Sequence, residues 1–421
     1  MNALSIVNKV ISLVSFKMHM SRQKALTACV KSLLNGNAAT VTSIGRGINN
    51  KAFEKHRIKR ADRLLSNTNL LHETPTIYAA TCQLLCSHIL RPVISVDWSD
   101  LDEHNGHFLL RAAISLKGRS ITLYQEVHCN KTREKQATHR AFLHALRAVL
   151  PSQCHPIIVT DAGYKSPWFR EVMALGWDIV GRVRRPHYYS SDAGHTWQCI
   201  HQLYAQATCR PKRFDNSQIV RSNPFACTLV LFKQKSKGRH ARNTDGSLKR
   251  SGHSKKHAQG AKDPWLLATS LSSHRQLSKQ VVGIYRQRMQ IEEGFRDMKS
   301  TKFGLGYEQN KSIKKQRLTI LILLTTLASL VAILLGMVLV SSNKHRQFQA
   351  NTETRSVLSF HYLGLRAIAC RIRFTMRQWK AALKWYSSTV DAAWTGGDMK
   401  LNSWDTSDSD PIIGRRFLPA W

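Results

Sequence analysis

Residues 92–98 read PVISVDW, a short run rich in β-branched residues that reaches Asp97. Runs of this kind are typical of strands. Two further strands are predicted over His107–Leu116 and Ser120–His128, with a turn at Lys117–Gly118 between them. The chain therefore begins its sheet with three successive strands connected by hairpins.

Helices and strands alternate in the residues that follow. We predict a helix over Ala137–Leu150, a strand over Pro156–Thr160, a helix from near Pro167 and a strand over Trp177–Val183. Three hairpin-connected strands followed by helix, strand, helix and strand is the order of an RNase H-like sheet.

The chain has 421 residues, which is too many for one compact core and predicts several domains. We expect an α/β fold with an RNase H-like core, a β-rich insertion, and helical N-terminal and C-terminal domains. The predicted boundaries are 1–90 for the helical N-terminal domain, 91–184 and 263–345 for the two parts of the core, 185–262 for the insertion with its basic loop, and 346–421 for the C-terminal region.

Positive charge dominates the chain, with 63 Lys and Arg against 26 Asp and Glu and a net charge of +37. A polyanionic partner explains this excess, because each neutralised phosphate releases condensed counterions. Basic residues crowd the second of two short helices predicted within 40–71, and the loop over 234–262 contains one acid, Asp245. Both segments suit contact with double-stranded DNA. A solvated helix pair and a disordered insert are the alternatives.

The nine Cys show no regular spacing, which fits reduced thiols, and residues 1–20 lack a convincing signal peptide. We therefore expect a cytoplasmic protein associated with the nucleoid. Leu318–Val340 is free of charge over 23 residues, long enough to span a bilayer. Hydroxyl side chains interrupt it and no Trp or Tyr flanks it, so we predict a buried central helix and no membrane contact. A membrane protein built around this segment is the alternative.

Two acidic residues follow short apolar runs, Asp97 after PVISV and Asp161 after PIIVT. Adjacent strand ends are rigid and can hold two carboxylates at a metal-bridging distance. Carboxylate oxygens are the ligands that Mg²⁺ prefers, and two such ions can promote phosphodiester displacement. Asp also ends strands as an ordinary turn residue, so this pair alone leaves both interpretations open.

A helix predicted over Leu277–Lys299 contains the run IYRQRMQIEEGFRDMKS at residues 284–300. Four polar side chains recur along it at i, i+3, i+7 and i+14, and at about 100° per residue they share an arc of about 60°. They are Tyr285, Arg288, Glu292 and Lys299. Glu293 points about 100° away from this face. We expect the face to meet the sheet edge that carries the two Asp, although polar residues on one face can also be the solvated side of a helix.

The spacing Tyr-x2-Arg-x3-Glu-x6-Lys resembles the YREK signature of bacterial DDE transposases of the IS-four insertion-sequence family. The blocks SVDWSD (95–100), IVTDAGY (158–164) and PWLLAT (264–269) are also similar to the branch of that family that moves a tetracycline-resistance composite transposon. The resemblance spans roughly residues 20–345 and thins in the basic loop and after about residue 360.

This resemblance implies a catalytic triad of Asp97, Asp161 and Glu292 that binds two Mg²⁺ ions, for which Mn²⁺ can substitute. It implies that Tyr285, Arg288 and Lys299 hold DNA phosphates near the cut. The family cuts each transposon end, forms and reopens a hairpin, and joins the free 3′-OH to target DNA. Its members work as homodimers on synapsed terminal inverted repeats.

Three further DNA contacts follow from position. Trp265 matches a block where relatives receive a flipped base, and Met289 could wedge into the vacated stack. Arg119, after the hairpin turn, could contact the DNA backbone. Core packing is the alternative for Trp265 and Met289. A catalytically silent, transposase-derived DNA-binding regulator is the alternative for the whole protein, although the signature is intact.

Overall fold

The computed structural model describes residues 3–102, 106–116, 118–184, 188–234, 247, 263–353 and 357–395. Three features named from the sequence lie wholly or partly outside these residues. They are the basic loop apart from Gln234 and Ser247, the chain after residue 395, and Lys117 in the predicted hairpin turn.

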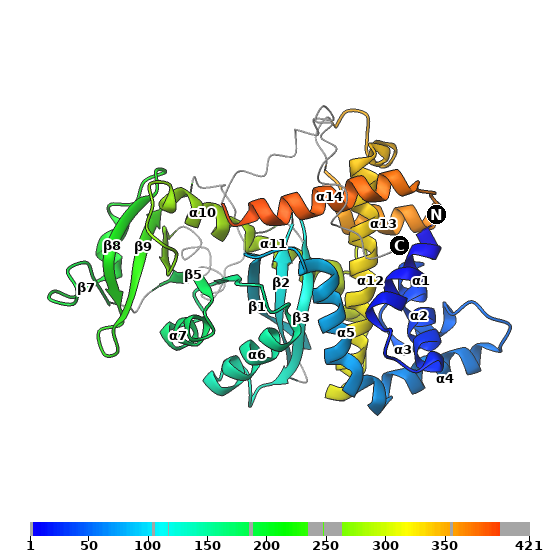
Figure 1. Cartoon of the computed structure of the whole chain (residues 1–421). Coiled ribbons are helices and arrows are strands. Elements are labelled where there is room, and N and C mark those ends of the chain that lie inside the picture. Colours follow the sequence, from blue (N-terminus) through cyan, green and yellow to red (C-terminus); the bar gives the residue numbers. More distant parts are fainter. Residues whose placement is uncertain are drawn as a thin grey trace.

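Within the described residues, ten strands form one mixed sheet (Figure 1). Its first half contains, in spatial order, β3 (Ser120–Cys129), β2 (His107–Ser115), β1 (Val93–Asp102), β4 (Ile157–Thr160) and β5 (Asp178–Val183). The pairs β3–β2 and β2–β1 are antiparallel, whereas β1, β4 and β5 run parallel. The strands predicted from the sequence in this half are therefore confirmed.

The second half of the sheet comes mostly from the region between residues 185 and 262. Its strands continue outward from β5 as β10 (Trp265–Thr269), β9 (Phe225–Phe232), β8 (Lys212–Ile219), β6 (Tyr188–Ser190) and β7 (Gln198–Cys199). Every pairing in this half is antiparallel. The short helix α8 (Ile200–Tyr204) follows β7. The insertion thus extends the sheet rather than forming a separate one.

Helices cover both faces of the sheet. The connections α6 (Gln136–Val149) and α7 (Ser166–Ala174) lie on one face. On the other face, α10 (Leu277–Gln287) shares an apolar cluster with Val93, Ile157 and Val180. Because strand residues alternate between faces, every second residue after Val93 and Ile157 points toward α10 and the helix that follows it.

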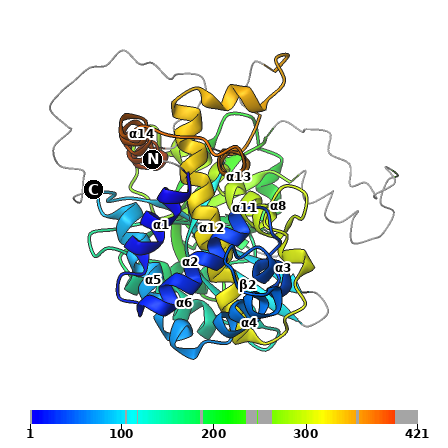
Figure 2. The same cartoon turned by 90° about the vertical axis from the view of Figure 1, so that its right-hand side faces the viewer.

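The remaining helices gather beside β3 and share one apolar cluster with that side of the sheet (Figures 1 and 2). From the N-terminal region come α1 (Ala3–Val14), α2 (Met20–Leu34), α3 (Val41–Arg46), α4 (Glu54–Leu65) and α5 (Thr68–Cys86). From the C-terminal half come η1 (Tyr307–Gln309), α12 (Lys315–Ser341), η2 (Lys344–Phe348), α13 (Phe360–Ala369) and α14 (Met376–Ala393). Helix α11 (Met289–Lys299) precedes them and crosses the sheet face over β1, β2 and β3. The far end of α14 reaches α10, where Gln280 and Gln287 donate hydrogen bonds to the carbonyls of Trp394 and Ala393.

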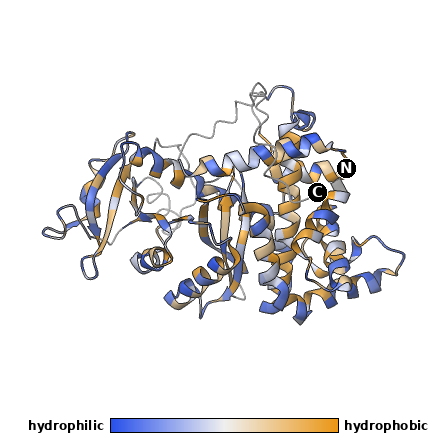
Figure 3. Cartoon of the chain, viewed as in Figure 1, coloured by the Kyte–Doolittle hydropathy of each residue, from blue (hydrophilic) through white to orange (hydrophobic). Residues whose placement is uncertain are grey.

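Helix α12 is long and apolar enough to cross a membrane by length and composition. It lies at the centre of the helical layer, where it packs against α2, α13, α14 and β3 (Figures 2 and 3). Its most apolar 18-residue window is 89% buried inside the protein. Packing from all sides explains why this helix has no polar face. The predicted buried central helix is therefore confirmed.

Close packing of α12 on α13 depends on two glycines. A Cβ on Gly364 would lie 1.8 Å from the carbonyl oxygen of Ala332, and one on Gly336 would lie 1.9 Å from that of Phe360. Since backbone cannot yield as a side chain can, Gly364→Ala should lower the free energy of unfolding by roughly 1–3 kcal/mol or more. Urea unfolding measures this loss, and Ser388→Ala on the exposed side of α14 is the control that should change it little. Equal stability of the two variants would contradict the close approach.

Candidate active site

Asp97 lies in β1, and Asp161 directly follows β4, the neighbouring parallel strand. The register of β1 and β4 pairs Val93 with Ile157 and Ser95 with Val159, and two more residues along each strand bring Asp97 opposite Asp161. Adjacent strands are about 4.8 Å apart. Both side chains also fall on the face covered by α10 and α11, because both are an even number of residues from a residue that packs there.

The position of Asp97 within its strand differs from the prediction. We expected the strand to end there, but β1 continues to Asp102 because its outer half pairs with β2, where Asp97 faces Arg111. On its other edge, β1 loses its partner when β4 ends at Thr160. Asp97 therefore lies in mid-strand, at the point where one edge becomes open. Asp161 does follow the end of β4, as predicted.

The predicted helix over Leu277–Lys299 is divided into α10 and α11 at Arg288. The amides of Arg288 and Ile291 each bond a carbonyl three residues earlier, at 3.1 Å, which tightens the helix locally. The prediction of one regular helix was wrong at this residue. The tightening lies where the side chain of Arg288 reaches across to β1.

Arg288 bridges two of the three predicted carboxylates. Its Nη1 donates to Oδ2 of Asp97 at 3.1 Å, and its Nη2 donates to Oε1 of Glu292 at 2.7 Å. The side chains of Arg288 and Asp97 are only 12% and 15% exposed, whereas that of Glu292 is 42% exposed. Since a buried charge needs a partner, this guanidinium compensates the carboxylates in the protein as it stands.

The electrostatics of Asp97 reflect crowding by negative charge. Burial raises the pKa of Asp97 to about 7, Arg288 opposes the rise, and the carboxylates of Asp161 and Glu292 add to it. All three acids therefore act on one small region. A carboxylate in this situation gains from any cation that approaches it.

Other residues of the predicted polar face surround this region. Lys299 Nζ donates to Ser99 Oγ on β1 at 2.9 Å, so α11 runs along the strand that carries Asp97. Tyr285 is buried, and its ring packs edge-on against that of Trp265 with centroids 4.9 Å apart. The guanidinium of Arg288 lies 5.9 Å from the Tyr285 ring centroid. The ring of Tyr285 thus packs beside the guanidinium of Arg288.

The three remaining predicted residues have different surroundings. Trp265 is the first residue of β10 and also contacts Phe232, at 5.7 Å between ring centroids. Met289 is 43% exposed beside Arg288. Arg119 lies apart from the three carboxylates, because its Nε donates to Asp297 on another face of α11 at 2.7 Å.

Two residues near the acidic pair, Gly163 and Tyr164, have no predicted role. The backbone amide of Gly163 donates to Oδ1 of Asp161 at 2.8 Å, and a Cβ at residue 163 would lie 3.0 Å from that oxygen. Tyr164 is buried, and its hydroxyl has no hydrogen-bond partner among the described residues. Burial, followed by the charges of Asp97 and Asp161, raises its pKa. Only the block IVTDAGY hinted at either role.

A divalent cation fits this site by donor chemistry. As the described side chains stand, no three His, Cys, Asp or Glu residues converge tightly enough to hold a metal ion. Two carboxylates in register and a third on the facing helix are nevertheless the hard oxygen donors that Mg²⁺ prefers. The bridging Arg288 shows that positive charge is stable between Asp97 and Glu292.

A comparison with protein families identifies the family to which the chain belongs. A family model described as the transposase DDE domain matches residues 90–331. The match runs from just before β1 into α12 and includes the whole sheet and α11. As it covers more than half of the chain, the protein belongs to the transposase DDE domain family. No sequence among the curated proteins is similar enough to count as a relative.

Membership of this family makes the chain a transposase, with DNA as its partner. Domains of this family generally use divalent metal ions.

Proposed function

We propose that this protein is a cut-and-paste DNA transposase of the IS-four family, with an RNase H-like core and with Asp97, Asp161 and Glu292 as its catalytic residues. The observation that carries the proposal is the β1–β4 register, which brings two carboxylates together on the face that α11 covers. The bridge from Arg288 to Asp97 and Glu292 supports the third member.

In the proposed mechanism, the three carboxylates bind two Mg²⁺ ions, for which Mn²⁺ can substitute. Such ions supply an activated attacking oxygen and stabilise the leaving oxygen of the phosphodiester. Gly163 fixes one oxygen of Asp161 and leaves the other available. Trp98 donates its backbone amide to Oδ1 of Asp97 at 2.9 Å, which leaves Oδ2 as the oxygen that Arg288 now contacts.

Arg288 and Lys299 hold DNA phosphates beside the cut, and Tyr285 acts mainly by supporting Arg288. The guanidinium is planar and multidentate, which suits it to exchange a carboxylate for a phosphate. Met289 is exposed enough to enter a base stack. Trp265, which packs against the ring of Tyr285, receives the flipped base. Arg119 contacts the DNA backbone only if its ion pair with Asp297 opens.

The wider function follows the same proposal. The protein acts as a homodimer on terminal inverted repeats, forms and reopens hairpins, and inserts the freed element into target DNA. It is cytoplasmic and associates with the nucleoid. Its N-terminal helices over 1–90 bind DNA, and its C-terminal region over 346–421 binds DNA ends and the second subunit. The core comprises residues 91–184 and 263–345, and the insertion comprises residues 185–262.

The test uses the full chain and a duplex that carries the repeats flanking its own gene. With Mg²⁺ we expect double-strand breaks at the element ends and hairpin products on denaturing gels, and with EDTA we expect binding alone. Binding without cutting in either Mg²⁺ or Mn²⁺ would overturn the proposal in favour of a silent DNA-binding regulator.

A further inference from the structure

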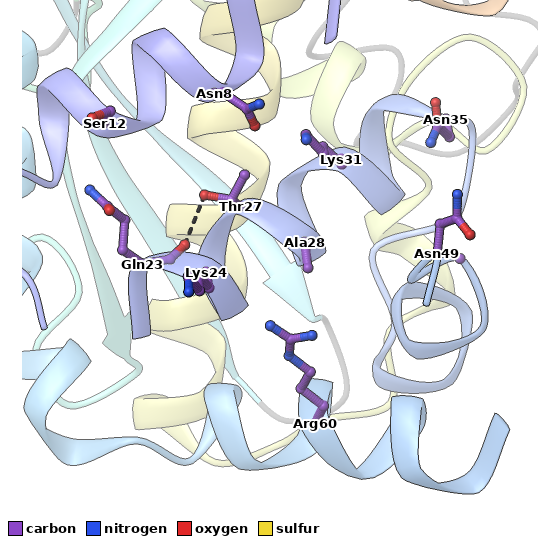
Figure 4. A pocket seen from close by; sticks show the side chains of 11 residues that line it. Asn8, Ser12, Gln23, Lys24, Thr27, Ala28, Lys31, Asn35, Asn49 and Arg60 are labelled. Atoms are coloured by element: carbon purple, nitrogen blue, oxygen red, sulfur yellow. Dashed lines mark hydrogen bonds between the residues drawn. The ribbon is translucent and has the colours of Figure 1, made fainter. Parts of the chain in front are cut away.

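A polar pocket of about 530 Å³ lies within the N-terminal helices (Figure 4). Its walls come from α1, α2, the residues after α3, and α4. None of its lining residues belongs to the sheet, α10 or α11, so it is separate from the three carboxylates. Its volume falls in the range of roughly 300–1,000 Å³ that is usual for small-molecule sites.

The charge on the pocket walls has one sign. Lys24, Lys31 and Arg60 line it, no Asp or Glu does, and within the described residues none of the three cations forms an ion pair (Figure 4). Lys31 is half-buried, and loss of hydration lowers its pKa. A cation that is partly removed from water and has no counterion carries an unfavourable desolvation free energy. A bound anion would offset this cost.

The C-terminal dipole of α2 accounts for only part of this arrangement. Lys31 lies in the last turn of α2, where a cation is favoured. Lys24 lies near the start of that helix and Arg60 lies on α4, so the dipole does not favour either of them. Three cations from two helices therefore line one space, although Lys24 is exposed, and the helix dipole accounts only for Lys31.

Half of the uncharged lining residues are carboxamides. They are Asn8, Gln23, Asn35 and Asn49. A carboxamide offers both donors and an acceptor, the combination that pairs with the edges of bases and with sugar hydroxyls. The amide nitrogen of Gln23 already donates to the carbonyl and hydroxyl oxygens of Ser15, at 3.3 and 3.0 Å. Thr27 is less available, because its hydroxyl donates to the carbonyl of Gln23 at 2.8 Å (Figure 4). Cations beside carboxamides match a ligand with a phosphate and a heterocycle.

We propose that this pocket binds a nucleotide, with its phosphate at Lys24, Lys31 and Arg60 and its base or sugar at the carboxamides. The nucleotide is either a unit of bound DNA or a free deoxynucleotide. The first source rests on the proposed DNA-directed function, whereas the second does not. Cutting at Asp97 is a separate property, and the following test does not depend on it.

The test measures binding to the full chain in EDTA, so that no DNA is cut. The probes are deoxyadenosine monophosphate, uncharged deoxyadenosine, and a 30-base-pair duplex. Lys31→Gln should weaken binding of the monophosphate or of the duplex roughly tenfold or more, because a charge-assisted hydrogen bond is lost. If DNA is the source, the slope of log K against log salt should also fall by about one. Deoxyadenosine should bind more weakly than its monophosphate.

Lys212→Gln is the control, since Lys212 is exposed on β8, outside the N-terminal helices, and does not line the pocket. Thermal melts of both variants show whether folding is intact, and Arg60→Gln repeats the test from the second helix. An effect on the duplex assigns the pocket to DNA, and an effect confined to the monophosphate assigns it to a free nucleotide. If Lys31→Gln and Arg60→Gln bind both probes as Lys212→Gln does, the pocket is not a nucleotide site.

Discussion

Replacing Asp97 by Asn will abolish DNA cutting and leave DNA binding intact. The substitution removes one charged oxygen from the centre of the site and preserves its shape and its place in β1. Metal ions contribute several kcal/mol to such reactions, and each 1.36 kcal/mol is a factor of ten in rate. We therefore expect the cutting rate to fall by at least about 1,000-fold in a single-turnover assay with Mg²⁺.

A pair of adjacent residues sharpens this prediction. Glu292→Gln should cause a comparable loss, whereas Glu293→Gln should retain nearly full activity. Glu293 pairs with Arg296 at 2.8 Å, on a different face of α11 from the contact with Arg288. Filter binding of end DNA in EDTA gives the affinity of each variant. Full cutting by Asp97→Asn, or equal losses in the two Glu variants, would show that the assigned triad is wrong.

Replacing Arg288 by Gln will destabilise the metal-free protein as well as impair cutting. Breaking a buried ion pair by removing one partner costs roughly 3–5 kcal/mol, because the other charge stays buried. With Arg288 in place the pKa of Asp97 is about 7, because burial raises it and Arg288 opposes the rise. Without Arg288 the pKa of Asp97 lies higher still. Asp97 is then protonated at pH 5 in both proteins, so their stabilities should be similar there, and the stability of the variant should fall below that of the parent as the pH rises above 7. Denaturant unfolding at several pH values measures this loss.

Added Mg²⁺ should restore much of the lost stability at pH 8, since the ion supplies the missing positive charge. Arg288→Lys should lie between the variant and the parent, because an ammonium group cannot bridge both carboxylates as a planar guanidinium does. Arg296→Gln removes an arginine that is 68% exposed and should change stability by less than about 0.5 kcal/mol. A pH-independent loss in Arg288→Gln would contradict the charge-compensating role.

Local patterns in the sequence were sufficient to predict most elements of the core. The apolar runs before Asp97 and Asp161 predicted β1 and β4. Because successive side chains of a strand point to opposite faces of the sheet, the position of each carboxylate along its run determines the face on which it lies. Helical periodicity likewise separated Glu292 from Glu293. These properties depend on a residue and its near neighbours along the chain, so they can be predicted without knowledge of the fold.

Tertiary structure decided the contacts between distant segments. Arg288 and Asp97 are 191 residues apart, and no local pattern indicates that they form an ion pair. No local pattern indicates the ring contact between Trp265 and Tyr285 or the ion pair between Arg119 and Asp297 either. The strand containing Asp97 also extends beyond its apolar run, because pairing with β2 supplies hydrogen bonds that the run itself does not reveal.

The opening stretch PVISVDW illustrates both contributions. Its sequence alone predicted a strand with an acidic residue at the end of the apolar run, although β1 continues to Asp102. Only the assembled sheet placed Asp161 opposite that residue and Arg288 above it, because register and helix packing depend on the whole core. The elements are therefore encoded locally, and the charges of the site are brought together by tertiary packing.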